Sequence, residues 1–93
     1  MKRDLVVSPQ FARAAKRIAK KSPKAVKRME KALEMLQGDA HDPRLKTHKL
    51  TGKLAGSWAC RAGYDLRIIF SFVKLKKEEA ILLETVGTHD EAY

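Results

Sequence analysis

The sequence predicts a small α+β protein whose antiparallel sheet carries an N-terminal pair of helices on one face. Two consecutive segments between residues 9 and 38 repeat apolar residues at helical spacing, and three segments between 57 and 86 have the apolar pattern of strands. A short apolar run at 5–7 precedes the helices and supplies a first strand. The expected order is therefore β-α-α-β-β-β. A chain of 93 residues fits one domain, which we expect to span residues 1–93.

The two helices begin at the same kind of signal. Ser8-Pro9 and Ser22-Pro23 each place a capping serine before a proline, and proline is well tolerated at the first position of a helix. Gly38 is a natural stop for the second helix. Because almost no loop separates the helices, they should form an antiparallel pair whose apolar stripes cover the sheet.

The second half of the chain is expected to form a three-stranded meander after a loop over residues 39–56. The strands should span 57–62, 65–73 and 80–86, with a charged hairpin between the last two. Apolar residues occur on both faces of the middle strand, which indicates a central position in the sheet.

The meander also predicts which polar residues meet. In an antiparallel meander the end of the last strand lies beside the start of the middle strand. His89 and Tyr93 follow the last strand and should therefore approach Arg61, Asp65 and Arg67. Residues far apart in the sequence are thus expected to form one polar site.

Charge is the strongest indication of a partner. The formal net charge is +9, and residues 1–53 carry fifteen basic and five acidic residues, whereas residues 54–93 carry five and six. A positive field of this size attracts phosphate backbones and acidic proteins. Nucleic acid, an acidic protein and an anionic membrane surface all remain possible on this ground alone.

The remaining composition favours a cytoplasmic protein. Cys60 is the one cysteine, so an internal disulfide is excluded, and this suits a reducing compartment. We expect Cys60 to be a small buried apolar residue. No signal peptide is expected at the start of the chain, and no apolar run approaches the roughly 20 residues that span a bilayer.

Four segments carry a resemblance to a known family. They are residues 48–52, 54–56, 61–70 and 87–93, which read HKLTG, LAG, RAGYDLRIIF and GTHDEAY. This set resembles the RelE/ParE toxin superfamily of bacterial toxin–antitoxin systems, and most of all its YafQ-type RelE branch. The resemblance covers nearly the whole chain, because the first strand and the helical pair match the family order.

The resemblance implies a toxin that cleaves messenger RNA on the ribosome, without a metal ion, and that a small antitoxin protein neutralises. The positions that match the family's catalytic pattern are His48, Asp65, Arg67, His89 and Tyr93. Two positions depart from the YafQ pattern. Arg61 stands where that pattern has a histidine, and Thr85 stands where it has an arginine.

The chemistry of RNA cleavage agrees with this set of residues. Attack by the 2′-hydroxyl needs a base, an acid for the leaving oxygen, and fixed positive charge beside the phosphate. Histidine suits proton transfer and arginine suits phosphate. We expect His48, Asp65 and His89 to serve as acid, base or orienting groups, and Arg67 to stabilise charge. The expected substrate-binding residues are Lys46, Lys49, Lys53 and Arg61.

Neither a metal nor another cofactor is expected, because the three histidines lack the spacing of zinc ligands. The positive surface should instead attract an acidic, partly disordered antitoxin, giving a toxin–antitoxin hetero-oligomer without membrane association. Two alternatives remain open. One is a ParE-like inhibitor that binds DNA gyrase, and the other is a non-catalytic RNA-binding module. The proton-transfer residues favour the nuclease.

Overall fold

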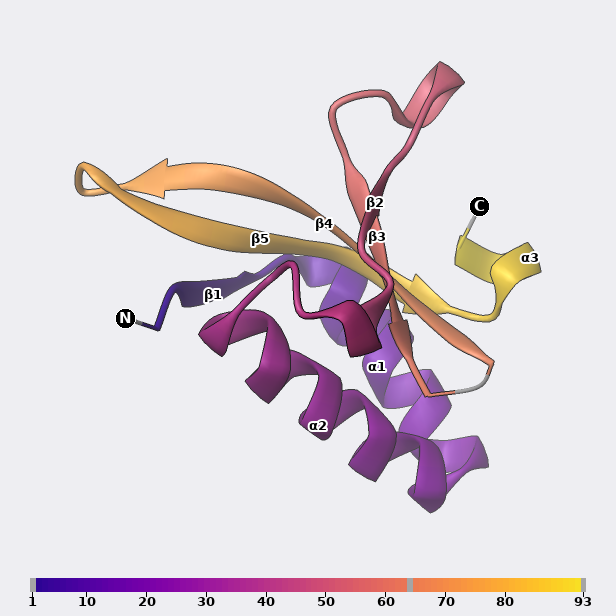
Figure 1. Ribbon diagram of the computed structural model, residues 1–93. Coiled ribbons are helices and arrows are strands. Elements are labelled where there is room, and N and C mark those ends of the chain that lie inside the picture. Colours follow the sequence, from indigo (N-terminus) through magenta and orange to yellow (C-terminus); the bar gives the residue numbers. More distant parts are fainter. Residues whose placement is uncertain (1, 64, 93) are drawn as a thin grey trace.

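The structure is a computed structural model that describes residues 2–63 and 65–92, except for the side chains of Asp90 and Glu91. It contains a five-stranded sheet with two long helices on one side (Figure 1). The elements in chain order are β1 (Asp4–Val7), α1 (Pro9–Lys21), α2 (Pro23–Gly38), the 3-10 turn η1 (Pro43–Leu45), β2 (His48–Lys49), the 3-10 turn η2 (Gly52–Leu54), β3 (Trp58–Ala62), β4 (Leu66–Leu75), β5 (Glu78–Gly87) and α3 (His89–Ala92). The expected fold class and order of the main elements are confirmed.

Both expected helix starts are confirmed by their caps. The Ser8 hydroxyl accepts the N–H of Phe11 at 3.0 Å, and the Ser22 hydroxyl accepts the N–H of Ala25 at 3.3 Å. The proline that follows each serine occupies the first turn. Helix α2 ends at Gly38 as expected. Capping thus separates α1 from α2 without a loop, so the two helices form a tight pair.

The sheet is mixed, which differs from the expected antiparallel sheet at one edge. The strand order is β1-β5-β4-β3-β2, and β1 pairs with β5 in parallel. The other pairings are antiparallel. A tight turn dictates the direction only of strands that follow each other directly. Most of the chain separates β1 from β5, so no turn constrains the direction of β1.

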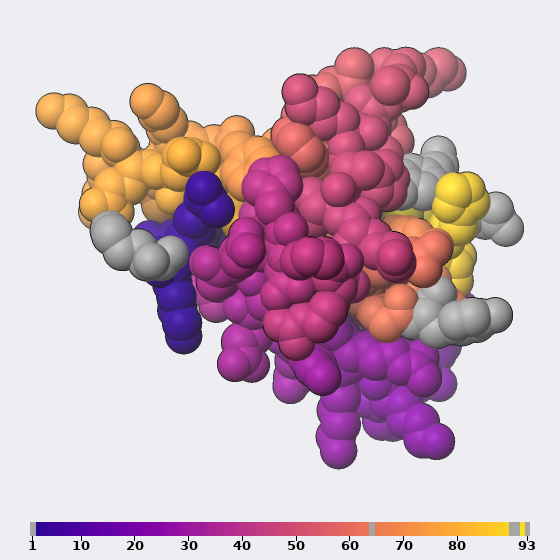
Figure 2. Space-filling view, viewed as in Figure 1, coloured from indigo at the N-terminus to yellow at the C-terminus, as the bar shows by residue number. Residues whose placement is uncertain are grey.

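The loop and hairpin boundaries also differ from the expectation. The segment 39–56 contains β2, which pairs with β3, and the turns η1 and η2. The turn between β4 and β5 is shorter than the expected hairpin and consists of Lys76 and Lys77, whose φ angles are 51° and 71°. A two-residue hairpin turn can require positive φ at both positions, which the lysine side chains gave no reason to expect. Figure 2 shows this hairpin and the loop around η2 as two projections from the body.

The core lies between the helical pair and the sheet. Its largest fully buried side chains include Leu36 of α2, Phe70 of β4 and Leu83 of β5. Strand β4 is central, as expected. Cys60 is buried in the same core, and burial raises the pKa of its thiol to about 12, so it is a poor nucleophile. Among the described residues, no helix combines the length and apolar character needed to cross a membrane.

A β-bulge joins the helical layer to the sheet. Ile69 pairs with Thr85 but Phe70 pairs with Leu83, so Glu84 is the extra residue on β5. The Glu84 carbonyl accepts the Ser8 hydroxyl at 3.1 Å, and its carboxylate accepts the Ser57 hydroxyl at 2.7 Å. Ser8 therefore caps α1 and also holds the bulge.

Ser8→Ala should destabilise the fold more than Ser22→Ala. Loss of a serine cap costs about 1 kcal/mol, and Ser8→Ala also removes a hydrogen bond worth about 1 kcal/mol. The expected losses are therefore about 2 kcal/mol for Ser8→Ala and about 1 kcal/mol for Ser22→Ala. Urea denaturation measures both. Equal losses in the two variants would contradict the second role of Ser8.

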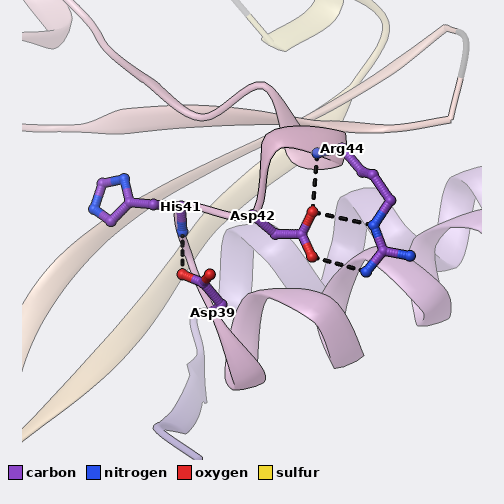
Figure 3. Close-up of polar contacts among 4 residues, drawn as sticks. All are labelled: Asp39, His41, Asp42 and Arg44. Carbon is purple, nitrogen blue, oxygen red and sulfur yellow. Dashed lines mark hydrogen bonds and ion pairs between the residues drawn. The ribbon is translucent and has the colours of Figure 1, made fainter.

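The loop that leads to β2 is held by a compact set of polar contacts. The Asp42 carboxylate accepts the Arg44 N–H at 2.9 Å and clamps the Arg44 guanidinium at 3.1 Å and 2.7 Å (Figure 3). Beside it, the His41 N–H donates to Asp39 at 3.0 Å. The Thr47 hydroxyl donates to the Ala40 carbonyl at 2.6 Å. These bonds fix the chain directly before His48.

The Asp42 clamp predicts a pH dependence of stability. Hydrogen bonds from the Arg44 side chain and backbone lower the pKa of Asp42 from 3.8 to about 2. Because the folded-state pKa is lower, the clamp stabilises the fold above about pH 4 and is lost as the pH falls toward 2. We expect wild type to be more stable than Asp42→Asn at about pH 6, with the difference closing between about pH 4 and 2. Thermal unfolding followed by circular dichroism measures it.

Asp39→Asn is the matched control for this experiment. Asp39 accepts a backbone N–H in the same loop, and within the described residues it has no guanidinium partner. A difference in thermal stability between wild type and Asp42→Asn that stayed constant down to about pH 2 would show that the clamp does not stabilise the fold.

Candidate functional site

Two arginines face each other across neighbouring strands. Arg61 of β3 and Arg67 of β4 are paired residues in the antiparallel register. Their chain neighbours Cys60, Leu66 and Ile68 belong to the core. Side chains alternate between the two faces of a sheet, so both arginines leave their strands on the face opposite the helices. In the part of the chain that the structure describes, strand β2 pairs only with Trp58 and Ala59 of β3, so Arg61 stands at an open edge of the sheet. The Arg67 guanidinium donates from Nη1 to the Leu66 carbonyl at 3.2 Å, which orients it.

The C-terminal segment meets these strands at the same end of the sheet. Arg67 is also paired with Gly87, the last residue of β5, and α3 begins two residues later at His89. The expected approach of the last strand to the start of the middle strand is therefore confirmed. In Figure 1, α3 lies with β2 and its following loop on the side of the strands away from α1 and α2.

His48 reaches this region from β2, the edge strand that lies next to β3. It is paired with Ala59 of β3, and its side chain is exposed. The His48 ring places Nδ1 3.0 Å from the Lys46 carbonyl oxygen. A carbonyl only accepts, so Nδ1 carries the proton of the neutral ring and Nε2 carries the lone pair. The backbone thereby assigns Nε2 as the nitrogen that can take up a proton.

These segments enclose an open pocket of about 790 Å³. Its lining is Lys46, His48, Lys49, Leu50, Thr51, Lys53, Leu54, Arg61, Arg67 and His89. The described lining residues thus include five cationic side chains and two imidazoles but no carboxylate. Among the side chains that the structure describes, which exclude those of Asp90 and Glu91, none of the five cations forms an ion pair. The pocket is therefore strongly positive and suited to a phosphodiester.

The pocket contains most of the site residues expected from the sequence, namely Lys46, His48, Lys49, Lys53, Arg61, Arg67 and His89. Asp65 does not line it. Asp65 instead accepts a hydrogen bond from Arg28 of α2 at 3.3 Å. Tyr93 lies outside the described residues. The catalytic roles of all these side chains stay predictions.

Three lining residues were not predicted. Leu50, Thr51 and Leu54 form part of the wall around the cations. Leu50 and Thr51 fall inside the 48–52 motif, so their place in that motif could have indicated that they line the site. Among the described residues, no group of three His, Cys, Asp or Glu side chains is placed to hold a metal ion.

The fold is shared with several solved bacterial toxins. YafQ from E. coli strain BL21(DE3) is 21% identical, with 99% of each chain covered and a TM-score of 0.77. The E. coli DinJ–YafQ toxin–antitoxin complex matches at 22% identity, covering 100% of this chain and 99% of that one, with a TM-score of 0.74. A YoeB/ParE toxin from Agrobacterium tumefaciens matches at 15% identity, covering 92% and 98%, with a TM-score of 0.77.

Sequence comparison gives the family. The chain matches no curated protein sequence. The family model described as the bacterial toxin of type II toxin–antitoxin systems, YafQ, matches residues 3–93. The match covers nearly the whole chain, including every described residue that lines the pocket. The chain therefore belongs to the YafQ family of type II toxin–antitoxin toxins.

Proposed function

We propose that this toxin is an endoribonuclease that cleaves messenger RNA on the ribosome by acid–base catalysis without a metal ion. One observation carries the proposal. His48 and His89 line one positive pocket together with Arg61 and Arg67. Two groups for proton transfer and two for phosphate are the parts that cleavage by a 2′-hydroxyl requires.

The reaction assigns one histidine to each proton. His48 Nε2 takes the proton of the 2′-hydroxyl, because its Nδ1 already donates to the Lys46 carbonyl. The 2′-oxygen then bonds to the phosphorus. As the bond from phosphorus to the 5′-oxygen breaks, His89 in its protonated form gives a proton to that oxygen. The products are a cyclic phosphate and a free 5′-hydroxyl.

The two arginines stabilise the negative charge that builds on the phosphate. A guanidinium stays protonated and can bind two phosphate oxygens at once. Arg67 is held by its bond to the Leu66 carbonyl, and preorganised donors need no rearrangement during the reaction. Lys46, Lys49 and Lys53 attract the neighbouring phosphates, so substrate binding should weaken with salt.

Asp65 is proposed to hold the site in place and not to transfer a proton, because its carboxylate accepts a hydrogen bond from Arg28. That pair ties α2 to the turn between Arg61 and Arg67. Tyr93 keeps the proposed role of an aromatic group that stacks on a base or donates a hydrogen bond.

An acidic antitoxin is proposed as the protein partner. The E. coli YafQ described above has been solved in complex with DinJ. In this chain the net charge of +9 and the five cations of the pocket favour an acidic segment that folds on binding. Such a segment would compete with RNA for the same positive surface.

Substitution of the pocket histidines should strongly slow cleavage while the protein stays folded. We expect His48→Gln and His89→Gln to slow cleavage of ribosome-bound messenger RNA by about 10²- to 10⁴-fold, and Arg67→Ala by about 10²- to 10³-fold. Mapping of transcript ends after induction without antitoxin measures this. Lys20→Ala, on the exposed surface of α1, is the matched control and should cleave like wild type.

Equal cleavage by wild type and both histidine variants would remove the proposed catalytic groups. Intact transcripts with stalled gyrase and DNA damage would instead indicate a ParE-like inhibitor. Intact transcripts with salt-dependent RNA binding would indicate a non-catalytic RNA-binding module.

The role of Asp65 can be separated from that of a catalyst. If Asp65 acts through Arg28, then Asp65→Asn should reduce cleavage in the wild-type background but have no further effect in Arg28→Ala, because the ion pair is already broken there. An acid or base at position 65 would give a loss above about 10²-fold in Asp65→Asn alone. Single-turnover cleavage rates on programmed ribosomes distinguish the two results.

A further inference from the structure

A second basic pocket adjoins the first. It has a volume of about 310 Å³ and lies between α2, η1 and β3. Four cationic side chains line it: Arg28, Lys31, Arg44 and Arg61. No carboxylate belongs to its described lining. The proposed nuclease mechanism gives no role to Lys31 or Arg44.

Two of these arginines are held in place from outside the pocket. Asp42 clamps Arg44 through Nε and Nη2 (Figure 3), and Asp65 accepts from Nη1 of Arg28. A guanidinium has five N–H donors, so each arginine keeps donors for an anion. The carboxylates therefore orient the two guanidinium groups without using all of their hydrogen-bonding capacity.

Gly63 leaves room for this arrangement. Its φ angle is +79°, and a Cβ atom added there would lie 2.7 Å from Cδ of Arg28. Any side chain at this position would displace the Arg28 stem. The turn between β3 and β4 thus admits the arginine that crosses from α2.

The floor of the second pocket is apolar. It consists of Ala32 and Met35 of α2 and Leu45 of η1. Ala32 and Leu45 are buried, and Met35 is half-buried. An apolar floor with a cationic rim matches a nucleotide, which presents the flat face of a base and a charged phosphate.

Arg61 lines both pockets, which argues for one continuous ligand. We propose that the second pocket binds the nucleotide next to the cleaved bond in a single-stranded RNA, with Arg61 between the two neighbouring phosphates. The volume lies at the lower end of the range for small-ligand sites, about 300 to 1,000 Å³, and suits one nucleotide. The inference rests on the proposed function, since it takes RNA as the ligand of the first pocket.

Binding of uncleavable RNA tests the inference without any dependence on catalysis. Fully 2′-O-methylated RNA lacks the hydroxyl that attacks the phosphate, so it binds without reaction. Affinities would be measured for a dinucleotide and for hexanucleotides that extend it at the 5′ end or at the 3′ end. We expect one of the two extensions to raise affinity by about tenfold, the effect of one charge-assisted hydrogen bond.

Lys31→Ala should remove most of that gain and leave dinucleotide affinity unchanged. Arg44→Ala, which also breaks the Asp42 clamp, should likewise remove most of the gain. The salt dependence of hexanucleotide binding should also become weaker, with a slope that falls by about 0.7 for each phosphate that the variant no longer neutralises. Lys24→Ala is the matched control, because Lys24 is an exposed lysine of α2 that lines neither pocket. It should keep the full gain.

Three results in RNA binding would overturn the subsite. These are equal affinity of wild type for all lengths, retention of the gain in both variants, and, in Lys31→Ala, equal loss of affinity for the dinucleotide and the hexanucleotide. Loss of affinity for the antitoxin with RNA binding unchanged would assign the pocket to a protein partner and also overturn it. If wild type cleaves ribosome-bound RNA but shows no length gain, the nuclease proposal stands and the subsite fails. If the length gain is present without cleavage, the reverse holds.

Discussion

The antiparallel register of β3, β4 and β5 is the constraint on which the candidate site depends. It pairs Arg61 with Arg67 and Arg67 with Gly87, so two guanidinium groups and the start of α3 meet at one end of the sheet. A slip of one residue would turn every side chain of a strand to the opposite face. It would bury an arginine in the core and expose Ile68, at high cost. The apolar pattern that fixes the fold therefore fixes the site.

The placement of carboxylates keeps the site positive. Two nearby acids, Asp65 and Asp42, pair with Arg28 and Arg44 of the second pocket and leave the cations of the first pocket without a carboxylate in its described lining. The cations of the first pocket therefore repel one another, since its described lining holds no carboxylate, and this repulsion opposes folding. Any polyanion that binds the folded state relieves it and raises stability by mass action. RNA and an acidic antitoxin would both act in this way, which gives a physical reason for the two to compete.

The sequence was most informative where the cause of structure is local. Both helix starts follow from a Ser-Pro pair, and the meander follows from apolar patterning together with short connections. The parallel pairing of β1 with β5 could not be predicted in this way, because no local turn relates the two strands. The same limit applies to the site. His89 and Arg67 were brought together by topology, whereas the contact of Asp65 with Arg28 depends on how α2 crosses the turn at Gly63.

The groups of the candidate site differ in how firmly they are held. Arg61 and Arg67 stand on paired strands of the sheet. His48 stands on a two-residue strand, supported by the Lys46 carbonyl and by the loop that Asp42 and Thr47 fix. Hydrogen-bond donors that stabilise charge on a phosphate act best when they are in place before the reaction. A group that transfers a proton must come within hydrogen-bond distance of it, and that hydrogen bond often tightens only when the substrate is bound. In the proposed reaction, the firmer support would thus lie under the arginines, which stabilise charge on the phosphate.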